Sequence, residues 1–147
     1  MQNTEIQEPK RYALIAGVAI FREGRVLALR RAEWKRGAGL WEVVAGRVEA
    51  GEAVESAAAR EAVEETGLDI ELHARPLGAY PIAGLDYFVV LFRADAGAGD
   101  VVLSNEHDAH KWVTPVEFRA LSTLSPLADA IDRAALESTQ QTPGTNP

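Results

Sequence analysis

The sequence predicts an α/β protein in which a mixed β-sheet is packed between helices. Apolar segments typical of strands lie both before and after one glutamate-rich helical segment, and further helical segments follow them. Strands interrupted by a helix in this order favour a mixed sheet with helices packed on it. The chain has 147 residues, of which 47% are hydrophobic, enough for one domain with its own core.

The first half of the domain is expected to contain three strands. Residues 13–21 are almost continuously apolar, residues 22–24 provide a turn, and residues 25–31 predict the second strand of a β-hairpin. A loop at residues 32–40 then leads to a short strand at residues 41–45.

A helix is predicted at residues 54–66, where Gly67 provides the C-cap. Three further strands are expected, at residues 70–80, 85–94 and 109–113.

Two helices are expected after the last strand. Residues 114–117 form a capping box with proline at the first helical position. The final helix follows residues 125–126 and places Leu127 and Ile131 on one face.

The two ends of the chain are predicted to be flexible tails. Residues 1–10 and 138–147 lack the apolar side chains needed to offset the entropy of ordering them. One domain therefore occupies residues 11–137.

The composition excludes several classes of site and partner. Without cysteine there is no disulfide framework, thiolate zinc site or cysteine nucleophile. A formal net charge of −7 argues against a stable nucleic-acid partner. No apolar run approaches the ~18 residues of a membrane span, and the N-terminus has no secretory pattern. We therefore expect a cytoplasmic protein with no membrane partner.

Three glutamates share one face of the predicted helix. At about 100° per residue, Glu61, Glu64 and Glu65 lie close together. The opposite side, which we expect to pack on the sheet, carries Ala59, Ala62, Val63 and Thr66. The like charges repel unless a hard cation binds them, and an oxygen-only ligand set suits Mg²⁺ or Mn²⁺.

A solvated glutamate face is the simpler interpretation, and Arg60 with Glu64 could be an ordinary ion pair. The longer pattern at residues 46–68 argues against it, because a chance match is on the order of one in 10⁵. These residues read GRVEAGEAVESAAAREAVEETGL. They contain a glycine, five residues, a glutamate, seven residues and Arg-Glu-aliphatic-x-Glu-Glu-x-Gly-aliphatic.

This segment resembles the Nudix box, and the chain is similar to the Nudix hydrolase family. The resemblance implies the Nudix-type α/β/α sandwich over nearly the whole domain. One departure is Ala62, where the family usually has a bulkier aliphatic residue. This difference loosens the expected packing under the helix but changes no ligand.

The resemblance also implies roles for individual residues. Glu61, Glu64 and Glu65 would hold the metal with the backbone carbonyl of Gly46. For Gly46, and for Gly51, turn geometry is an equally good explanation.

Other roles concern residues around this cluster. Glu52 and Arg60 would pair and support the loop against the helix. Glu106 lies in a loop where family members often have a catalytic or metal-binding glutamate; the alternative is an exposed loop residue. Either Arg30 or Arg31 could bind substrate phosphate, the other facing solvent.

The implied function is metal-dependent hydrolysis of a diphosphate linkage in a nucleoside diphosphate joined to another moiety. Glu64 or Glu106 would accept the proton of the attacking water. The substrate is a small nucleotide, and both a nucleoside triphosphate and an ADP-ribose-like sugar nucleotide remain open, as do monomer and homodimer. A catalytically silent nucleotide-binding or sensor domain is the alternative, although every box carboxylate is present.

Overall fold

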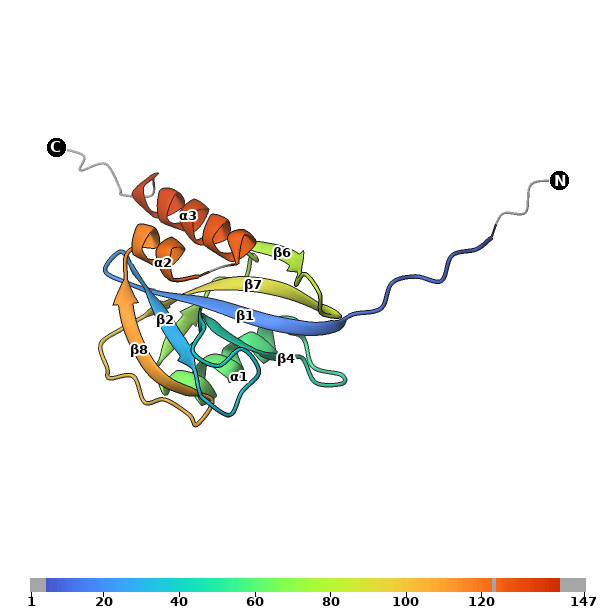
Figure 1. Cartoon of the computed structure of the whole chain (residues 1–147). Helices are drawn as coiled ribbons and strands as arrows, with labels where there is room; N and C mark the ends of the chain where they lie inside the picture. The colour runs from blue at the N-terminus through green and yellow to red at the C-terminus, as the bar shows by residue number, and fades with distance from the viewer. Residues whose placement is uncertain (1–4, 123, 141–147) are drawn as a thin grey trace.

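A computed structural model describes residues 5–122 and 124–140. The described chain is an α/β/α sandwich, as predicted: an eight-stranded sheet has one helix on one face and two on the other (Figure 1). The elements are β1 (Ala13–Arg22), β2 (Arg25–Arg31), β3 (Trp41–Glu42), β4 (Val44–Arg47), α1 (Val54–Thr66), β5 (Ile70–Leu72), β6 (Gly78–Pro81), β7 (Tyr87–Ala96), β8 (His107–Val113), α2 (Pro115–Leu121) and α3 (Ser125–Gln140).

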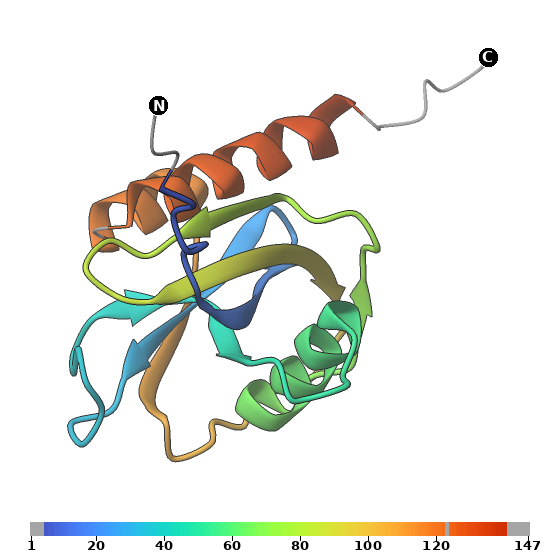
Figure 2. The ribbon, with the colours of Figure 1, turned by 90° about the vertical axis from the view of Figure 1, so that its right-hand side faces the viewer.

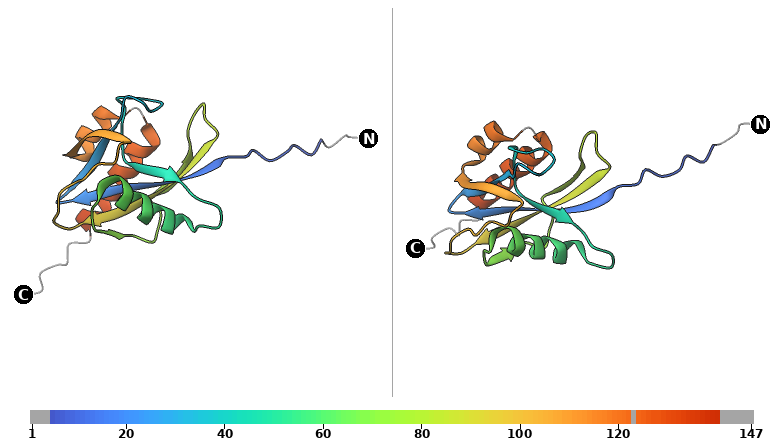
Figure 3. Two further views of the ribbon diagram at one scale, coloured as in Figure 1. Left: turned by 90° about the horizontal axis from the view of Figure 1, so that it is seen from below. Right: turned by 60° about the horizontal axis from the view of Figure 1, so that its bottom comes forward.

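Strand β1 is the centre of the sheet. It runs parallel to β7 along one edge, while β4 and β2 pair antiparallel with different parts of it. Since β7 pairs along one edge of β1, β4 and β2 both pair along its other edge. β4 pairs with the first half of β1 and β2 with its end, so the sheet divides between these two strands. Helices α2 and α3 lie together on one side of this sheet (Figure 2), and α1 lies on the opposite side (Figure 3).

The alternation of side chains along β1 builds two cores. Ile15, Ala19 and Phe21 belong to the core under α2 and α3, whereas Val18 and Ile20 belong to the core under α1. A strand buried on both faces has no polar alternation, which explains the continuous apolar run in the sequence.

Several predicted boundaries were wrong. The strand expected at residues 41–45 is two strands, because β3 pairs with β2 while β4 pairs with β1 and continues to Arg47. The strand expected at residues 70–80 is likewise β5 and β6, which pair with different parts of β7. Strand β8 begins at His107, and α3 continues through Ser138 to Gln140. Most of the predicted tails, residues 1–4 and 141–147, lies outside the described residues.

Helix α1 has the predicted bounds, and the face that packs on the sheet is only partly the predicted one. Ala57, Ala58 and Ala62 are fully buried, whereas Val63, expected on the packed side, is 55% exposed. Ala62 and Thr66 are buried as expected. The three small alanines bring the helix close to the sheet, and this close approach determines where its glutamates lie.

Candidate functional site

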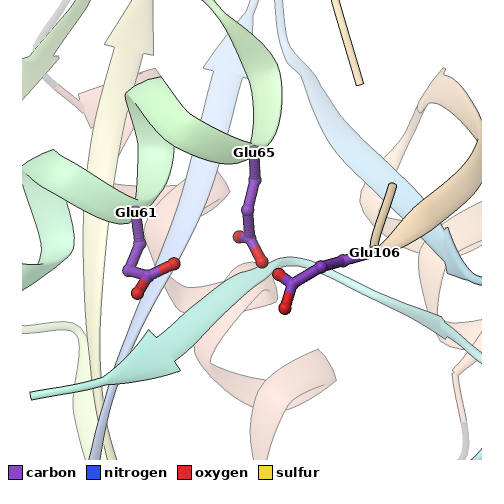
Figure 4. Close-up of side chains that lie close together, drawn as sticks. All are labelled: Glu61, Glu65 and Glu106. Carbon is purple, nitrogen blue, oxygen red and sulfur yellow. The ribbon is translucent and has the colours of Figure 1, made fainter. Parts of the chain in front are cut away.

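Three carboxylates from two distant parts of the chain converge beside β4. Glu61 and Glu65 come from successive turns of α1, and Glu106 comes from the residue before β8 (Figure 4). Each carboxylate contributes one oxygen to a group of three oxygens that all lie within 4.8 Å of one another. The i, i+4 spacing stacks the two helical glutamates on one face. The loop glutamate that the resemblance singled out completes this cluster.

Glu65 is the most deeply buried member, with 1% of its surface exposed. Its Oε2 accepts a hydrogen bond from the backbone N–H of Ala45 at 3.1 Å, but Oε1 has no hydrogen-bond partner among the described residues. Burial, together with the neighbouring Glu106 and Glu61, raises the pKa of Glu65 to about 10. Without a cation this carboxyl therefore holds a proton at neutral pH.

The other two members each have a cationic partner. Burial raises the pKa of Glu61, although Arg60 opposes the shift through a 2.9 Å contact with Oε1. Burial also acts to raise the pKa of Glu106, but Glu65 and Lys35 outweigh it and the net shift is downward. Lys35 Nζ lies 3.2 Å from Glu106 Oε1.

Gly46 is required by the position of Glu61. A Cβ atom at residue 46 would lie 2.0 Å from Cδ of Glu61, closer than any real contact. Gly46 is in β4, paired with Ala16, so the turn explanation fails for it. Gly51 does have the positive φ of 77° that turn geometry requires, in the loop before α1.

Glu52 and Arg60 join this loop to the helix. Arg60 donates to both carboxylate oxygens of Glu52 at 2.9 Å and to the carbonyl of Arg47 at 3.2 Å. This pairing lowers the pKa of Glu52 to about 2. The geometry is that of a supporting pair: it fixes Arg60 beside Glu61.

Glu64 lies outside the carboxylate cluster. Its side chain is 56% exposed, and its Oε2 is 3.3 Å from Arg60 Nη1. The structure thus brings Glu106, rather than Glu64, together with Glu61 and Glu65.

A cleft of about 340 Å³ opens over the cluster. Its lining combines the acidic groups with three cationic side chains, Arg31, Lys35 and Arg47. Arg30 is instead paired with Asp108 at 2.6 Å and is absent from the lining. Of the two predicted phosphate-binding arginines, only Arg31 faces the cleft.

Sequence reasoning missed the group that holds Arg31 in place. Arg31 Nη1 lies 3.0 Å from both carboxylate oxygens of Glu42, and buried His107 contacts the same carboxylate at 2.8 Å. The pairing of β3 with β2 and of β8 with β2 creates this contact. Without the strand register, the sequence carries no signal for it.

A small apolar pocket adjoins the cleft, between the sheet and the start of α3. Its volume is about 60 Å³, and it shares Glu42 and the apolar residues Ile15, Ala45 and Ile82 with the cleft. Tyr80 and Leu127 line its far part. The combined site therefore offers charged groups at one end and apolar surface at the other.

No helix in the described parts of the chain combines the length and the apolar character needed to span a membrane.

Comparison with known proteins agrees with this geometry. A family model for the NUDIX domain matches residues 11–135. A MutT-like protein of Streptomyces ambofaciens is 36% identical over 103 residues, covering 70% of this chain and 64% of that protein. The NAD-capped RNA hydrolase NudC of Vibrio vulnificus is 37% identical over 105 residues, covering 69% of this chain and 37% of that enzyme.

A solved structure gives the same result. The MutT protein of Methanosarcina mazei Go1 is 29% identical and superposes with a TM-score of 0.71, covering 90% of this chain and 99% of that one. The chain spans less than two thirds of the length of either curated relative. The family match, by contrast, covers nearly the whole described domain, so the chain belongs to the Nudix hydrolase family.

Proposed function

We propose that this protein is a metal-dependent hydrolase that cleaves a diphosphate linkage in a nucleoside diphosphate joined to another moiety. The convergence of Glu61, Glu65 and Glu106 at the base of a cation-lined cleft carries the proposal. Membership of the Nudix hydrolase family supports the same reaction class.

The carboxylate cluster fits a hard divalent cation. Its donors are oxygens only, and Glu65 Oε1 is buried with no hydrogen-bond partner among the described residues. Such a donor set suits Mg²⁺ or Mn²⁺, with Glu61, Glu65 and Glu106 as the residues that would hold it. When bound, the ion would supply charge neutralisation for the diphosphate and a lower pKa for the attacking water.

The protein's own side chains bind the substrate and move the proton. Arg31, fixed by Glu42, faces the cleft and binds phosphate oxygens, as does Arg47. Of the two candidate bases, Glu106 lines the cleft, whereas Glu64 is held outside it by Arg60. We therefore assign Glu106 as the better placed proton acceptor.

The apolar surface that adjoins the charged cleft supports a substrate that carries a less polar group next to its phosphates, as a nucleotide does. The NudC relative is named for NAD-capped RNA, and the MutT-like relative carries no substrate in its name. Nucleoside triphosphates, ADP-ribose-like sugar nucleotides and capped RNA ends are therefore the classes to compare.

A substrate panel tests the proposal. The panel contains nucleoside triphosphates, ADP-ribose, NAD and NAD-capped RNA, each assayed with Mg²⁺, with Mn²⁺ and with excess chelator. We expect turnover of at least one class with metal and none with chelator. Full turnover in chelator refutes the proposal. Nucleotide binding without turnover of any member supports the silent sensor domain instead.

A further inference from the structure

The carboxylate cluster has two cationic partners, and they are held very differently. Arg60, beside Glu61, is fixed by both oxygens of Glu52 and by a backbone carbonyl. Lys35, beside Glu106, makes one ion pair among the described residues, at 3.2 Å, and lies 5.8 Å from the ring centre of Trp34. A lysine is a point charge on a flexible stem, so it exchanges partners more readily than a forked arginine.

The loop that carries Lys35 does not depend on this ion pair. The N–H of Ala32 donates to the carbonyl of Glu106 at 2.9 Å, and the indole N–H of Trp34 donates to the carbonyl of Asn105 at the same distance. Farther along the loop, Arg31 Nε donates to the carbonyl of Arg36 at 2.7 Å. The Lys35 side chain can therefore turn while its backbone stays in place.

Lys35 also faces the place where a substrate phosphate would lie. Its side chain is 18% exposed and lines the cleft with Arg31, Gly46 and Arg47. A cation bound between the carboxylates would draw on the same Glu106 carboxylate that now pairs with the ammonium group. Lysine and metal would then compete for one carboxylate.

We propose that Lys35 is an exchangeable counter-ion: it neutralises Glu106 in the metal-free protein and turns to the substrate phosphate once metal binds. Only the second part of this inference, the binding of Lys35 to substrate phosphate, rests on the proposed function. The first half concerns the metal-free protein and needs no turnover. In this scheme the ammonium group blocks Glu106 when no metal is present and becomes a phosphate ligand when metal is present.

Calorimetric titration with Mn²⁺ tests the first half. Lys35→Met keeps the stem but removes the charge, so we expect Mn²⁺ to bind roughly three- to tenfold more tightly. Lys35→Arg should bind Mn²⁺ no more tightly than the wild type, because it keeps the competing charge on a side chain that exchanges partners less readily. Arg36→Met is the matched control: it removes one positive charge from the same loop, and that side chain is exposed. An equal gain in both Met variants overturns the proposal, since the effect is then general electrostatics.

Titration with inorganic phosphate tests the second half. In the Mn²⁺-saturated protein, Lys35→Met should weaken phosphate binding by about tenfold, and Arg36→Met by much less. Weaker binding of both Mn²⁺ and phosphate overturns the exchange, because it indicates that Lys35 only supports the loop. If Lys35→Met fails to fold, Lys35→Gln is titrated in the same way with the same two outcomes. If no substrate of the panel is turned over but Lys35→Met still binds Mn²⁺ more tightly, the proposed function is wrong. The competition between Lys35 and the metal for Glu106 is then still supported.

Discussion

Replacement of Glu65 by glutamine separates the role of its charge from the role of its shape. Glutamine keeps the length and the oxygen that accepts from Ala45, and its amide group can donate to Glu106. What it loses is the ability to ionise. If Glu65 is a metal ligand kept out of water, this single change has opposite effects on the metal-free and metal-bound protein.

The size of the effect in the metal-free protein follows from the pKa of Glu65. This pKa is raised from 4.5 to about 10 in the folded state. A raised folded-state pKa gives stability that is present below pH 4.5 and is lost as the pH rises toward 10. At pH 7.5 the loss is about 4 kcal/mol, and at pH 5 it is below ~1 kcal/mol. Glu65→Gln removes this penalty, so in chelator it should be more stable than the wild type at pH 7.5 by a few kcal/mol, on the order of that loss.

Urea unfolding in chelator at pH 5 and pH 7.5 measures this difference. Glu55→Gln is the matched control, because Glu55 is an exposed residue in the first turn of the same helix. Its effect should be a few tenths of a kcal/mol at either pH. With Mn²⁺ added, the wild type should gain stability and Glu65→Gln should gain much less. The reasoning fails if Glu65→Gln is less stable than the wild type in chelator at pH 7.5, or if its advantage is the same at both pH values.

Two further predictions concern the proton acceptor and the floor of the site. Glu106→Gln should lower kcat on the best substrate of the panel by ~10² or more, with the fold intact. The loss should exceed that of Glu64→Gln. A larger loss in Glu64→Gln would make Glu64 the base instead. Gly46→Ala should destabilise the protein by about 1–3 kcal/mol and abolish stabilisation by Mn²⁺, because the new methyl group overlaps the Glu61 carboxylate. Gly97→Ala, where an added Cβ meets nothing within 4 Å, should unfold at nearly the wild-type temperature in the same melting experiment.

The predictable part of the site was the part that a single helix specifies. The box spacing located α1 to the residue and identified Glu61 and Glu65, because helical periodicity alone determines that they share a face. The contact with Glu106 depends on how β8 meets β2, which no local pattern encodes. The same holds for Lys35, whose position is set by the hydrogen bonds of its loop.

The packing face of α1 could not be deduced from hydrophobicity. Val63 is the most apolar residue of the helix interior, yet it is exposed, while the smaller Ala58 and Ala62 are buried. The deciding factor is distance rather than hydrophobicity. Alanines allow the helix backbone to approach β4, and Gly46 lets a carboxylate fit between the two.

This close packing also favours the metal-binding interpretation of the glutamate-rich face over a solvated one. Glutamates that only keep a helix soluble lie in water, as Glu64 does. Glu61 and Glu65 instead lie on the packed side, where burial removes water from their carboxylates. This loss of hydration raises the pKa of both side chains. Such an arrangement destabilises the metal-free fold, and ordinary solvation would avoid it at no cost. A bound cation would reverse the balance, because it needs the same buried, closely spaced oxygens that destabilise the metal-free protein.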